Sequence, residues 1–376
     1  MMKLNNPRPG RIRLFRKHVN FLLEWTLGDS EKIIWSWINH LVSTEIADNV
    51  LAKNHHISDK KIRNSQTKNI RLYIQQAYEL YEAAKFTKAN TAPLFYYYSF
   101  LNLAKALCEI IYPDFHKRNE SSKHGLSWKP NNRPAVKFDI EKVDLTTRGV
   151  WHCLLEFLSK SKKVVPNPVS LKIKDLFSFC PEISSEYKSS CGEDSRIIFL
   201  EEPSILIDNN NCWIRFSIDK NKLSDLQISK KKFLSLISKS AGNYEEIKPH
   251  SSILHSFQLK NVKPYSPQDE NSAYEALSDE ILNLNLFTIL QAKKNIYYVP
   301  TQHKLIFKVP QLLAMYTIFF WLSSLVRYNP HGMESIQRSK YWFLVDGFMN
   351  QSRLWLLELF AWEFYNTEKV LLNSRM

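Results

Sequence analysis

An arginine and a histidine near the end of the chain are the residues whose types and spacing could do chemistry. Arg327 and His331 stand in the segment RYNPHG, directly after a long apolar run. An arginine can stabilise charge that develops on a phosphate, and a histidine can transfer a proton near neutral pH. The pair could therefore cleave a phosphodiester bond without a metal ion. A structural role is the alternative, because a cation at the carboxyl end of a helix is attracted by its free carbonyl groups.

A stripe of polar residues follows in the aromatic segment 341–362. Asp346, Asn350 and Arg353 recur at i, i+4 and i+7, so one face of a helix would carry all three. A polar group in apolar surroundings costs about 1–3 kcal/mol unless it has a partner. This face therefore either belongs to a structural hydrogen-bond network or lines a wet cleft.

A similar pattern occurs early in the chain, in residues 93–111. Ser99, Asn102 and Lys105 are spaced three apart among Phe, Tyr and Leu. The lysine could extend past its neighbours to solvent, or this face could meet the later polar stripe. His124, which precedes a glycine in KHGLS, is either a turn residue or part of the site. We count Tyr328, Asn329 and these residues as a candidate supporting shell.

Periodic apolar segments predict the helices that must position these residues. Residues 57–85 and 93–111 show helical spacing, and residues 312–326 carry no polar side chain apart from hydroxyl groups. A helix that is apolar on all sides lies in a core or a membrane, and this one is shorter than the roughly 18–20 residues of a span. Because Pro330 disfavours helix at the residue before it, we expect this buried helix to end near Arg327, in a chain reversal at Gly332.

The periodicity changes in the second half of the chain. Residues 196–200, 204–207, 212–218 and 256–262 alternate like strands, and 295–309 resembles a hairpin. We predict an α+β fold that is predominantly helical, a helical bundle with a small inserted antiparallel sheet. The expected segments are 1–56 (a basic arm and short helices), 57–180 (the first half of the bundle), 181–310 (the α+β insert) and 311–376 (the second half of the bundle, with the RYNPH turn).

The charge balance favours an anionic partner. The 376 residues carry a formal net charge of +14, and Lys3 and five further basic residues precede the first acid, Glu24. We expect nucleic acid, RNA rather than DNA, to contact these residues: Arg8, Arg11, Arg13, Arg16 and Lys17. The chain has eight glycines and no Gly-rich phosphate loop, which argues against a nucleotide-binding core.

The cysteines and the amino-terminal residues bear on compartment and cofactors. Five scattered cysteines without CxxC spacing predict neither a zinc site nor a disulfide framework. No apolar segment of the signal-peptide type follows the basic start. We therefore expect a cytoplasmic protein with no cofactor, no metal and no membrane partner.

Two resemblances narrow the expected function. The segments PLFYYYSFLNLAKAL, KHGLS and LSSLVRYNP resemble the YaaC-like proteins, a bacterial family of largely unassigned function. The arginine and histidine after a buried helix are similar to those of the HEPN superfamily of metal-independent ribonucleases, and would correspond to Arg327 and His331. HEPN enzymes separate the two by four to six residues, whereas three intervene here. HEPN sites commonly form across a dimer, so the resemblance also implies a homodimer.

Two functional hypotheses follow. In the first, the protein is a HEPN-like ribonuclease of antiphage defence or a toxin-type effector, with His331 as proton acceptor or donor and Arg327 stabilising the phosphorane. In the second, it is a non-catalytic subunit that binds nucleic acid or a partner protein. Cleavage of RNA in EDTA would distinguish them.

Overall fold

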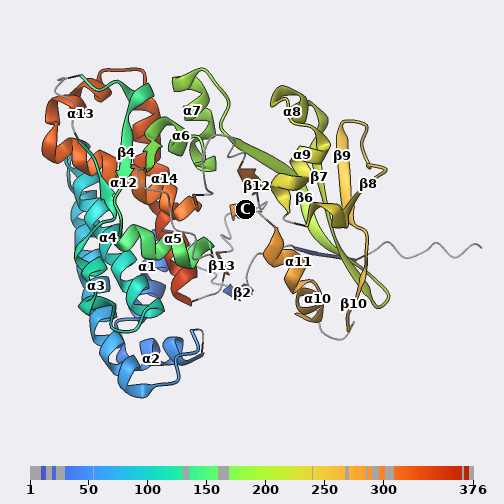
Figure 1. Ribbon diagram of the computed structural model, residues 1–376, viewed down its shortest axis with the longest axis horizontal. Helices are drawn as coiled ribbons and strands as arrows, with labels where there is room; N and C mark the ends of the chain where they lie inside the picture. Colours follow the sequence, from blue (N-terminus) through green and yellow to red (C-terminus); the bar gives the residue numbers. More distant parts are fainter. Residues whose placement is uncertain are drawn as a thin grey trace, which may run out of the picture. The chain divides into compact units, whose positions relative to one another are not determined.

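The fold is α+β and mostly helical, as the sequence predicts (Figure 1). The computed structural model describes residues 10–13, 19–22, 30–53, 55–129, 135–159, 169–238, 240–266, 271–284, 287–289, 296–300, 309–365 and 368–371. These residues form two compact units. The first comprises residues 1–27, 197–301 and 368–376, and the second comprises residues 28–196 and 302–367.

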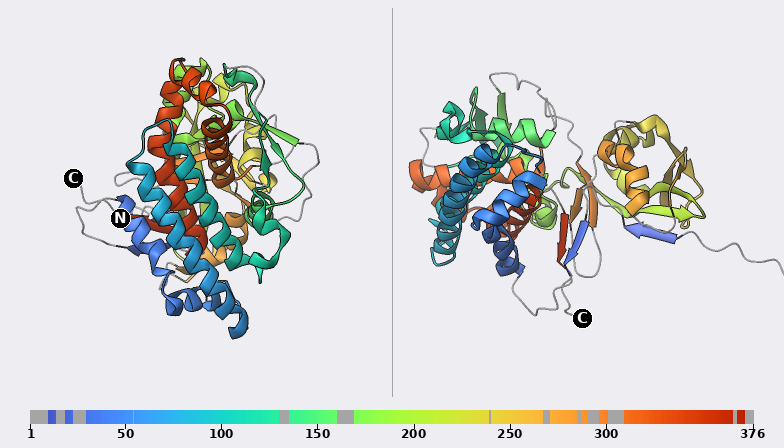
Figure 2. Two further views of the ribbon diagram at one scale, coloured as in Figure 1. Left: turned by 90° about the vertical axis from the view of Figure 1, so that its left-hand side faces the viewer. Right: turned by 90° about the horizontal axis from the view of Figure 1, so that it is seen from below.

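The second unit is a helical bundle that joins early and late parts of the chain. Its helices are α1 (Ser30–His40), α2 (Thr44–Lys53), α3 (Lys60–Lys85), α4 (Ala92–Ile111), α5 (Val150–Ser159), α6 (Ile173–Phe177), α7 (Ser184–Cys191), α12 (Gln311–Tyr328), α13 (Pro330–Gln337) and α14 (Trp342–Tyr365). Helix α4 packs against α3, α12 and α14, and Figure 2 shows α3, α4 and α14 running alongside one another. The two helices predicted from separate halves of the chain thus lie in one bundle.

Helix α12 is the buried centre of this unit. Every residue from Leu312 to Leu325 is buried, because the sequence offers no polar face that could be turned to solvent. Its hydroxyl groups are satisfied locally: Thr317 donates to the Leu313 carbonyl at 2.7 Å, and Ser324 to the Phe320 carbonyl at 2.8 Å. No helix in the described part of the chain is both long and apolar enough to cross a membrane.

The chain reversal expected after α12 differs from the one observed. Instead of an open turn, helix α13 begins at Pro330, where proline is tolerated because the first helical position needs no backbone donor. Asn329 caps this helix by accepting a hydrogen bond from the Gly332 amide at 2.9 Å. The predicted end of the buried helix near Arg327 agrees with the observed end of α12 at Tyr328.

Short elements connect α4 to the rest of the bundle. They are the 3-10 helices η1 (Phe115–Lys117), η2 (Asn119–Ser122), η3 (Phe138–Ile140) and η4 (Pro181–Ile183), and a small antiparallel sheet of β3 (Leu126–Ser127), β4 (Lys142–Leu145) and β5 (Val169–Lys172). Strand β5 is followed directly by α6. Burial alternates along β5 because its apolar residues fall at every second position.

The first unit is built on an antiparallel sheet. Its strands are β1 (Gly10–Arg13), β6 (Ile197–Asp208), β7 (Asn211–Asp219), β8 (Tyr244–Ile247), β9 (Leu254–Leu259), β10 (Lys263–Pro264), β11 (Phe287–Ile289) and β12 (Ile296–Pro300). The two strands predicted at 196–200 and 204–207 form one strand, β6, with an irregular register between Glu201 and Ser204. Asn209 turns the chain into β7 with a positive φ of 52°, which asparagine tolerates better than most residues.

Helices cover this sheet and complete its core. They are α8 (Lys220–Asp225), α9 (Lys230–Ile237), α10 (Asn271–Ala276) and α11 (Ser278–Asn283). Phe216 of β7 and Phe257 of β9 pack with Phe233 of α9, at centroid distances of 6.3 and 5.7 Å from its ring. A separate parallel pair joins β2 (Val19–Leu22) to β13 (Glu368–Leu371). The second strand predicted for the hairpin at 304–309 lies almost wholly outside the described residues.

Candidate functional site

Arg327 is half-buried in the last turn of α12 and lies between two tyrosine rings. Its Nη1 donates to the Tyr98 hydroxyl at 2.9 Å, and its Nε lies 3.4 Å from the Ser323 carbonyl one turn earlier. The guanidinium carbon is 5.6 Å from the ring centroid of Tyr98 and 4.8 Å from that of Tyr328. The bond to Ser323 is the helix-end contact of the structural interpretation. The third guanidinium nitrogen, Nη2, has no hydrogen bond to a described residue, so it is free to donate to a ligand.

His124 is brought near Arg327 by the start of α5. The Trp151 amide of α5 donates to the His124 carbonyl at 3.1 Å, and the Val150 amide donates to the Lys123 carbonyl at 2.9 Å. Gly125 follows with a φ of +83°, and a Cβ there would come within 2.9 Å of the Trp151 side chain. The KHGLS segment therefore needs glycine after the histidine, both for the backbone conformation and for the close approach to α5.

The surroundings of His124 keep its imidazole neutral. Burial, followed by the positive charges of Arg327 and Lys105, lowers the pKa of His124 to about 4. Its Nδ1 shares a hydrogen bond of 2.6 Å with the Tyr97 hydroxyl, which lies 3.4 Å from the Tyr316 hydroxyl. At pH 7 the imidazole is thus an uncharged group facing two cations.

Lys105 is the second cation of this group. Its Nζ lies 5.7 Å from the ring centroid of Tyr73, and burial lowers its pKa. Neither Lys105 nor Arg327 forms an ion pair with a carboxylate of the described residues. We call Tyr97, Tyr98, Lys105, His124 and Arg327 the Arg327 cluster. It carries two positive charges and no described negative charge, which is the composition of a site for an anion.

The other residues of the RYNPHG segment are placed differently. His331 is exposed at the second position of α13, and no hydrogen bond joins its ring to a described residue. Tyr328 is 59% exposed and covers one side of the Arg327 guanidinium, while Asn329 is the cap of α13. Arg327 is therefore placed beside Tyr98 and His124, and the assignment of His331 as its catalytic partner stays a prediction.

The polar residues predicted on α4 separate into two groups. Ser99 is fully buried and donates to the Ala77 carbonyl of α3 at 2.7 Å, so its hydroxyl joins two helices. Asn102 is half-buried, one helical turn after Tyr98 and shortly before Lys105. Asn102 thus continues the α4 face that carries the Arg327 cluster.

The polar stripe of α14 is also divided. Asn350 donates to Asp346 at 3.1 Å on the exposed side of the helix. Arg353 instead donates to Glu31 of α1 at 2.8 Å and lies over the rings of Tyr81 and Tyr96. The structural-network interpretation fits the Arg353 contacts. The hydrogen bonds of Asp346, Asn350 and Arg353 described here all go to residues outside the Arg327 cluster.

The basic arm is only partly described. Arg11 and Arg13 belong to β1, which pairs with β6 so that they stand opposite Leu206 and Ser204. The remaining members of the predicted nucleic-acid-binding set lie outside the described residues: Arg8, Arg16 and Lys17. Their role stays a prediction.

Sequence reasoning missed the tyrosines of the cluster. Tyr97 and Tyr98 sit within the run FYYYSF, which reads as apolar packing when residues are taken one by one. One signal could have found them: the resemblance to the YaaC-like proteins is carried by this run together with KHGLS and LVRYNP. The Arg327 cluster contains at least one residue from each of these three segments. In the described part of the chain no group of three His, Cys, Asp or Glu side chains could hold a metal ion.

The fold and the cluster define a mostly helical α+β protein with a tyrosine-lined pair of cations at the junction of α4, α5 and α12. The family model of the YaaC-like proteins matches residues 39–364, and the chain belongs to this family. Comparison with curated proteins found no match, and comparison with solved structures found none either.

Proposed function

We propose that the protein binds nucleic acid and that the Arg327 cluster holds a backbone phosphate. One observation carries the proposal: after burial, the charges of Arg327 and Lys105 lower the pKa of His124, and neither cation forms an ion pair with a described carboxylate. Half-buried cations without counter-ions are electrostatically unfavourable, and an anion bound between them removes that cost. The free Nη2 of Arg327 and the Nζ of Lys105 are the donors available to phosphate oxygens.

Two further features favour nucleic acid over a small anion. The net charge of +14 attracts a polyanion over a long range and raises its rate of association. Tyr328 is exposed beside the guanidinium and offers an aromatic face on which an unpaired base can stack. A single strand fits these features better than a duplex, because its bases are free to stack on a protein side chain.

The narrower form of the proposal is cleavage of bound RNA without a metal ion. Arg327 would stabilise the negative charge that grows on the phosphorane. An imidazole must also take the proton of the 2′-hydroxyl, and the HEPN resemblance assigns this role to His331. His331 is exposed and free to approach a ligand, which is what supports this assignment.

Oligonucleotide binding at several salt concentrations tests the proposal. For wild type, log K should fall linearly with log salt concentration, by about 0.7 per phosphate contact on a single strand. Arg327→Ala should weaken binding about tenfold and remove about one contact from that slope. Arg338→Ala is the matched control, because this arginine is 78% exposed and already paired with Glu334. Equal binding by the wild type and the Arg327 variant would overturn the proposal.

Incubation of labelled RNA in EDTA tests the narrower form. We expect Arg327→Ala and His331→Ala to lose cleavage while the Arg338→Ala control retains it. Cleavage that persists in the His331 variant removes that residue from the mechanism. Binding without any cleavage by wild type would make the protein a non-catalytic nucleic-acid-binding subunit.

A further inference from the structure

Two cysteines meet where α4 packs against α5. Cys108 of α4 is fully buried, whereas Cys153, near the start of α5, is partly exposed. The Cys108 thiol donates a hydrogen bond to the Cys153 sulfur, and both cysteines are free thiols. The two sulfur atoms are therefore neighbours without a covalent bond, and Cys153 is the member of the pair that reaches the surface.

Tyr112, the residue after the end of α4, fixes the backbone around both cysteines. Its amide donates to the Cys108 carbonyl at 2.8 Å, and its hydroxyl donates to the Cys153 carbonyl at 3.1 Å. The Cys153 amide in turn donates to the Gly149 carbonyl at 3.2 Å. Both cysteines are thus held at fixed backbone positions, on two helices that are joined through one tyrosine.

The two thiols differ in acidity. The hydrogen bond from Cys108 lowers the pKa of Cys153, although burial opposes this shift. Burial, followed by the same hydrogen bond, raises the pKa of Cys108 well above its ordinary value. The thiolate, which is the nucleophilic form of cysteine, therefore forms on Cys153 while Cys108 keeps its proton.

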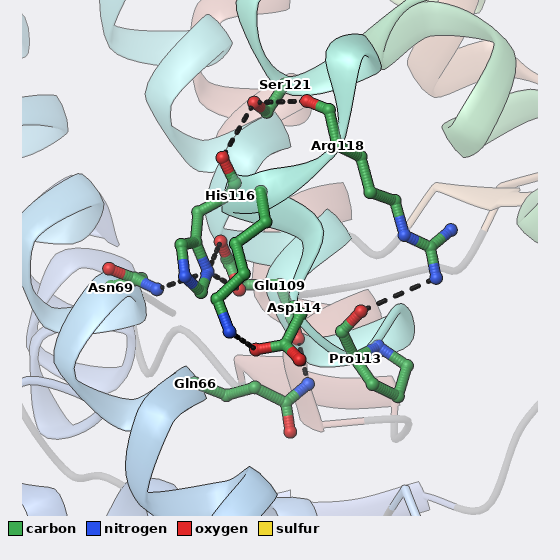
Figure 3. A network of polar contacts seen from close by, with 9 residues as sticks. Gln66, Asn69, Glu109, Pro113, Asp114, His116, Arg118 and Ser121 are labelled. Atoms are coloured by element: carbon green, nitrogen blue, oxygen red, sulfur yellow. Dashed lines mark hydrogen bonds and ion pairs between the residues drawn. The ribbon is translucent and has the colours of Figure 1, made fainter.

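Arg118 is the cation that favours this thiolate (Figure 3). Its Nη2 donates to the Pro113 carbonyl at 3.4 Å, and its guanidinium carbon lies 5.1 Å from the ring centroid of Tyr112. The positive charge lowers the pKa of Cys153. Two carboxylates act in the opposite direction: Glu120 and Glu156. The pKa of Cys153 is lowered in spite of them, so the hydrogen bond and the arginine together outweigh burial and the two acids.

Cys191 shows what happens to a thiol of similar exposure without such a partner. Like Cys153 it is partly exposed, and it lies at the end of α7. Burial raises the pKa of Cys191 to about 11. Among the five cysteines, all of which lie in described segments, only Cys108 and Cys153 shift the pKa of each other. The acidity of Cys153 thus comes from the pairing, and Cys191 provides a matched control.

We propose that Cys108 and Cys153 are a site of reversible oxidation, at which a hydroperoxide converts the two thiols into a disulfide between α4 and α5. This inference is independent of the proposed binding of nucleic acid. Cys153 attacks the oxidant, because it is partly exposed and forms the thiolate. Cys108 completes the disulfide, because it is buried against the Cys153 sulfur. Hydrogen peroxide is the simplest member of the class, and its small, uncharged molecule can approach a partly buried sulfur.

The reaction consists of two displacements and balances. The Cys153 thiolate attacks one oxygen of hydrogen peroxide, a sulfur–oxygen bond forms, and the oxygen–oxygen bond breaks to release hydroxide. The Cys108 sulfur then attacks the Cys153 sulfur, the sulfur–oxygen bond breaks, and the leaving hydroxyl takes the Cys108 proton to form water. The two sulfurs lose two electrons and the peroxide gains them. Dithiothreitol restores both thiols by thiol–disulfide exchange.

Peptide mapping of the full chain after treatment with hydrogen peroxide tests the site. Trypsin places the two cysteines in separate peptides, residues 106–117 and 149–160, each with a single cysteine. Once the peroxide has been removed and free thiols have been alkylated during unfolding, we expect these peptides to be joined by a disulfide that dithiothreitol cleaves. Cys191→Ser should give the same product as wild type. Oxidised wild type without this linked pair would overturn the inference.

Two variants separate the roles of the cysteines. In Cys108→Ser the sulfenic acid of Cys153 has no partner, so it should accumulate and be trapped by dimedone. In Cys153→Ser the buried Cys108 should remain a thiol. In wild type, Cys153 should be oxidised at least about tenfold faster than Cys191. Equal rates at Cys153 and Cys191, or a sulfenic acid on Cys108 in the Cys153 variant, would contradict these roles.

Oxidation of wild type in urea shows whether the fold produces the pairing. In the unfolded chain the thiols have no fixed neighbours, so we expect disulfides that also involve the other three cysteines: Cys180, Cys191 and Cys212. The folded chain should give the pair Cys108–Cys153 in clear excess over all others. If this pair formed in the same proportion in both states, the contact between α4 and α5 would have no part in the reaction, and the inference would be wrong.

Discussion

Two arginines in the helical unit lie among tyrosines, but only one of them forms an ion pair with a described carboxylate. Arg353 lies over Tyr81 and Tyr96 and donates to Glu31 at 2.8 Å. Arg327 lies over two tyrosine rings as well, but it bonds to a hydroxyl and a carbonyl and has no carboxylate among its described neighbours. The aromatic setting is therefore shared, and the counter-ion is what distinguishes the two.

The difference separates a structural role from a binding role. Glu31 also contacts Lys85 at 2.7 Å, so the Arg353 network is closed by charges of the protein itself. Arg327 forms no ion pair with a described carboxylate, and burial, followed by the charges of Arg327 and Lys105, lowers the pKa of His124. A site that is electrostatically complete stabilises the fold, whereas an incomplete one can be completed by a ligand.

Removing Arg353 should have the largest effect on stability. Arg353→Ala leaves Glu31, which is only 8% exposed, with Lys85 as its remaining described cation. We expect a loss of about 2–4 kcal/mol in the free energy of unfolding, measured by urea denaturation. Arg327→Ala should cost less than about 1 kcal/mol in the same experiment. If the two losses were equal, the proposed contrast between Arg353, which is paired with a carboxylate, and Arg327, which is not, would be wrong.

Glu182 is the reverse case of Arg327, a buried carboxyl group that forms no ion pair with a described cation. Oε2 of Glu182 is buried without a hydrogen bond to a described residue, while Ser352 donates to Oε1. Burial raises the pKa of Glu182 from 4.5 to about 7. The folded state therefore holds the Glu182 proton more tightly than the unfolded state does. This proton stabilises the folded protein fully below pH 4.5, and its contribution to the free energy of unfolding is lost as the pH rises to about 7.

This loss of stability should disappear in Glu182→Gln, which cannot ionise. The shift corresponds to about 3 kcal/mol, so the variant should be more stable than wild type at pH 8 by up to this amount. Urea denaturation between pH 4.5 and pH 8 measures it. A variant with the same pH dependence as the wild type would show that Glu182 does not titrate in this range.

The smallest expected effect concerns the hydroxyl that fixes Arg327. Tyr98→Phe keeps the ring below the guanidinium but removes the acceptor of the 2.9 Å bond from Nη1. Binding of a 2′-O-methyl oligonucleotide should weaken about two- to fivefold, with a stability change under about 1 kcal/mol. Tyr112→Phe serves as a control, because this hydroxyl donates to the Cys153 carbonyl, away from the cluster. A larger loss in the control than in Tyr98→Phe would contradict the role given to Tyr98.

Much of the fold could be predicted from local patterns. The spacing of Ile70, Ile74 and Ala77 defines the buried face of α3, and the unbroken apolar run of α12 gives its burial on all sides. The helix α13 could not be separated from a turn, because Pro330 ends one helix and begins the next. The irregular register of β6 also leaves no clear signal, since it depends on pairing with β7.

The site was harder to predict because its members are distant in sequence. Arg327 was found from its place after an apolar helix, and His124 from the glycine that follows it. Spacing alone linked Arg327 to His331, four residues away, whereas the bundle places it beside Tyr98, more than two hundred residues away.

The ionisation of His124 gives the most direct test of an open anion site. Its pKa of about 4 reflects burial and the charges of Arg327 and Lys105, so a phosphate bound between these cations must raise it. NMR titration of the His124 ring, with and without a saturating 2′-O-methyl oligonucleotide, measures this effect. We expect a rise of about 1 unit or more when the oligonucleotide is bound. An unchanged pKa in the saturated complex would show that the phosphate binds elsewhere and that the two cations do not form its site.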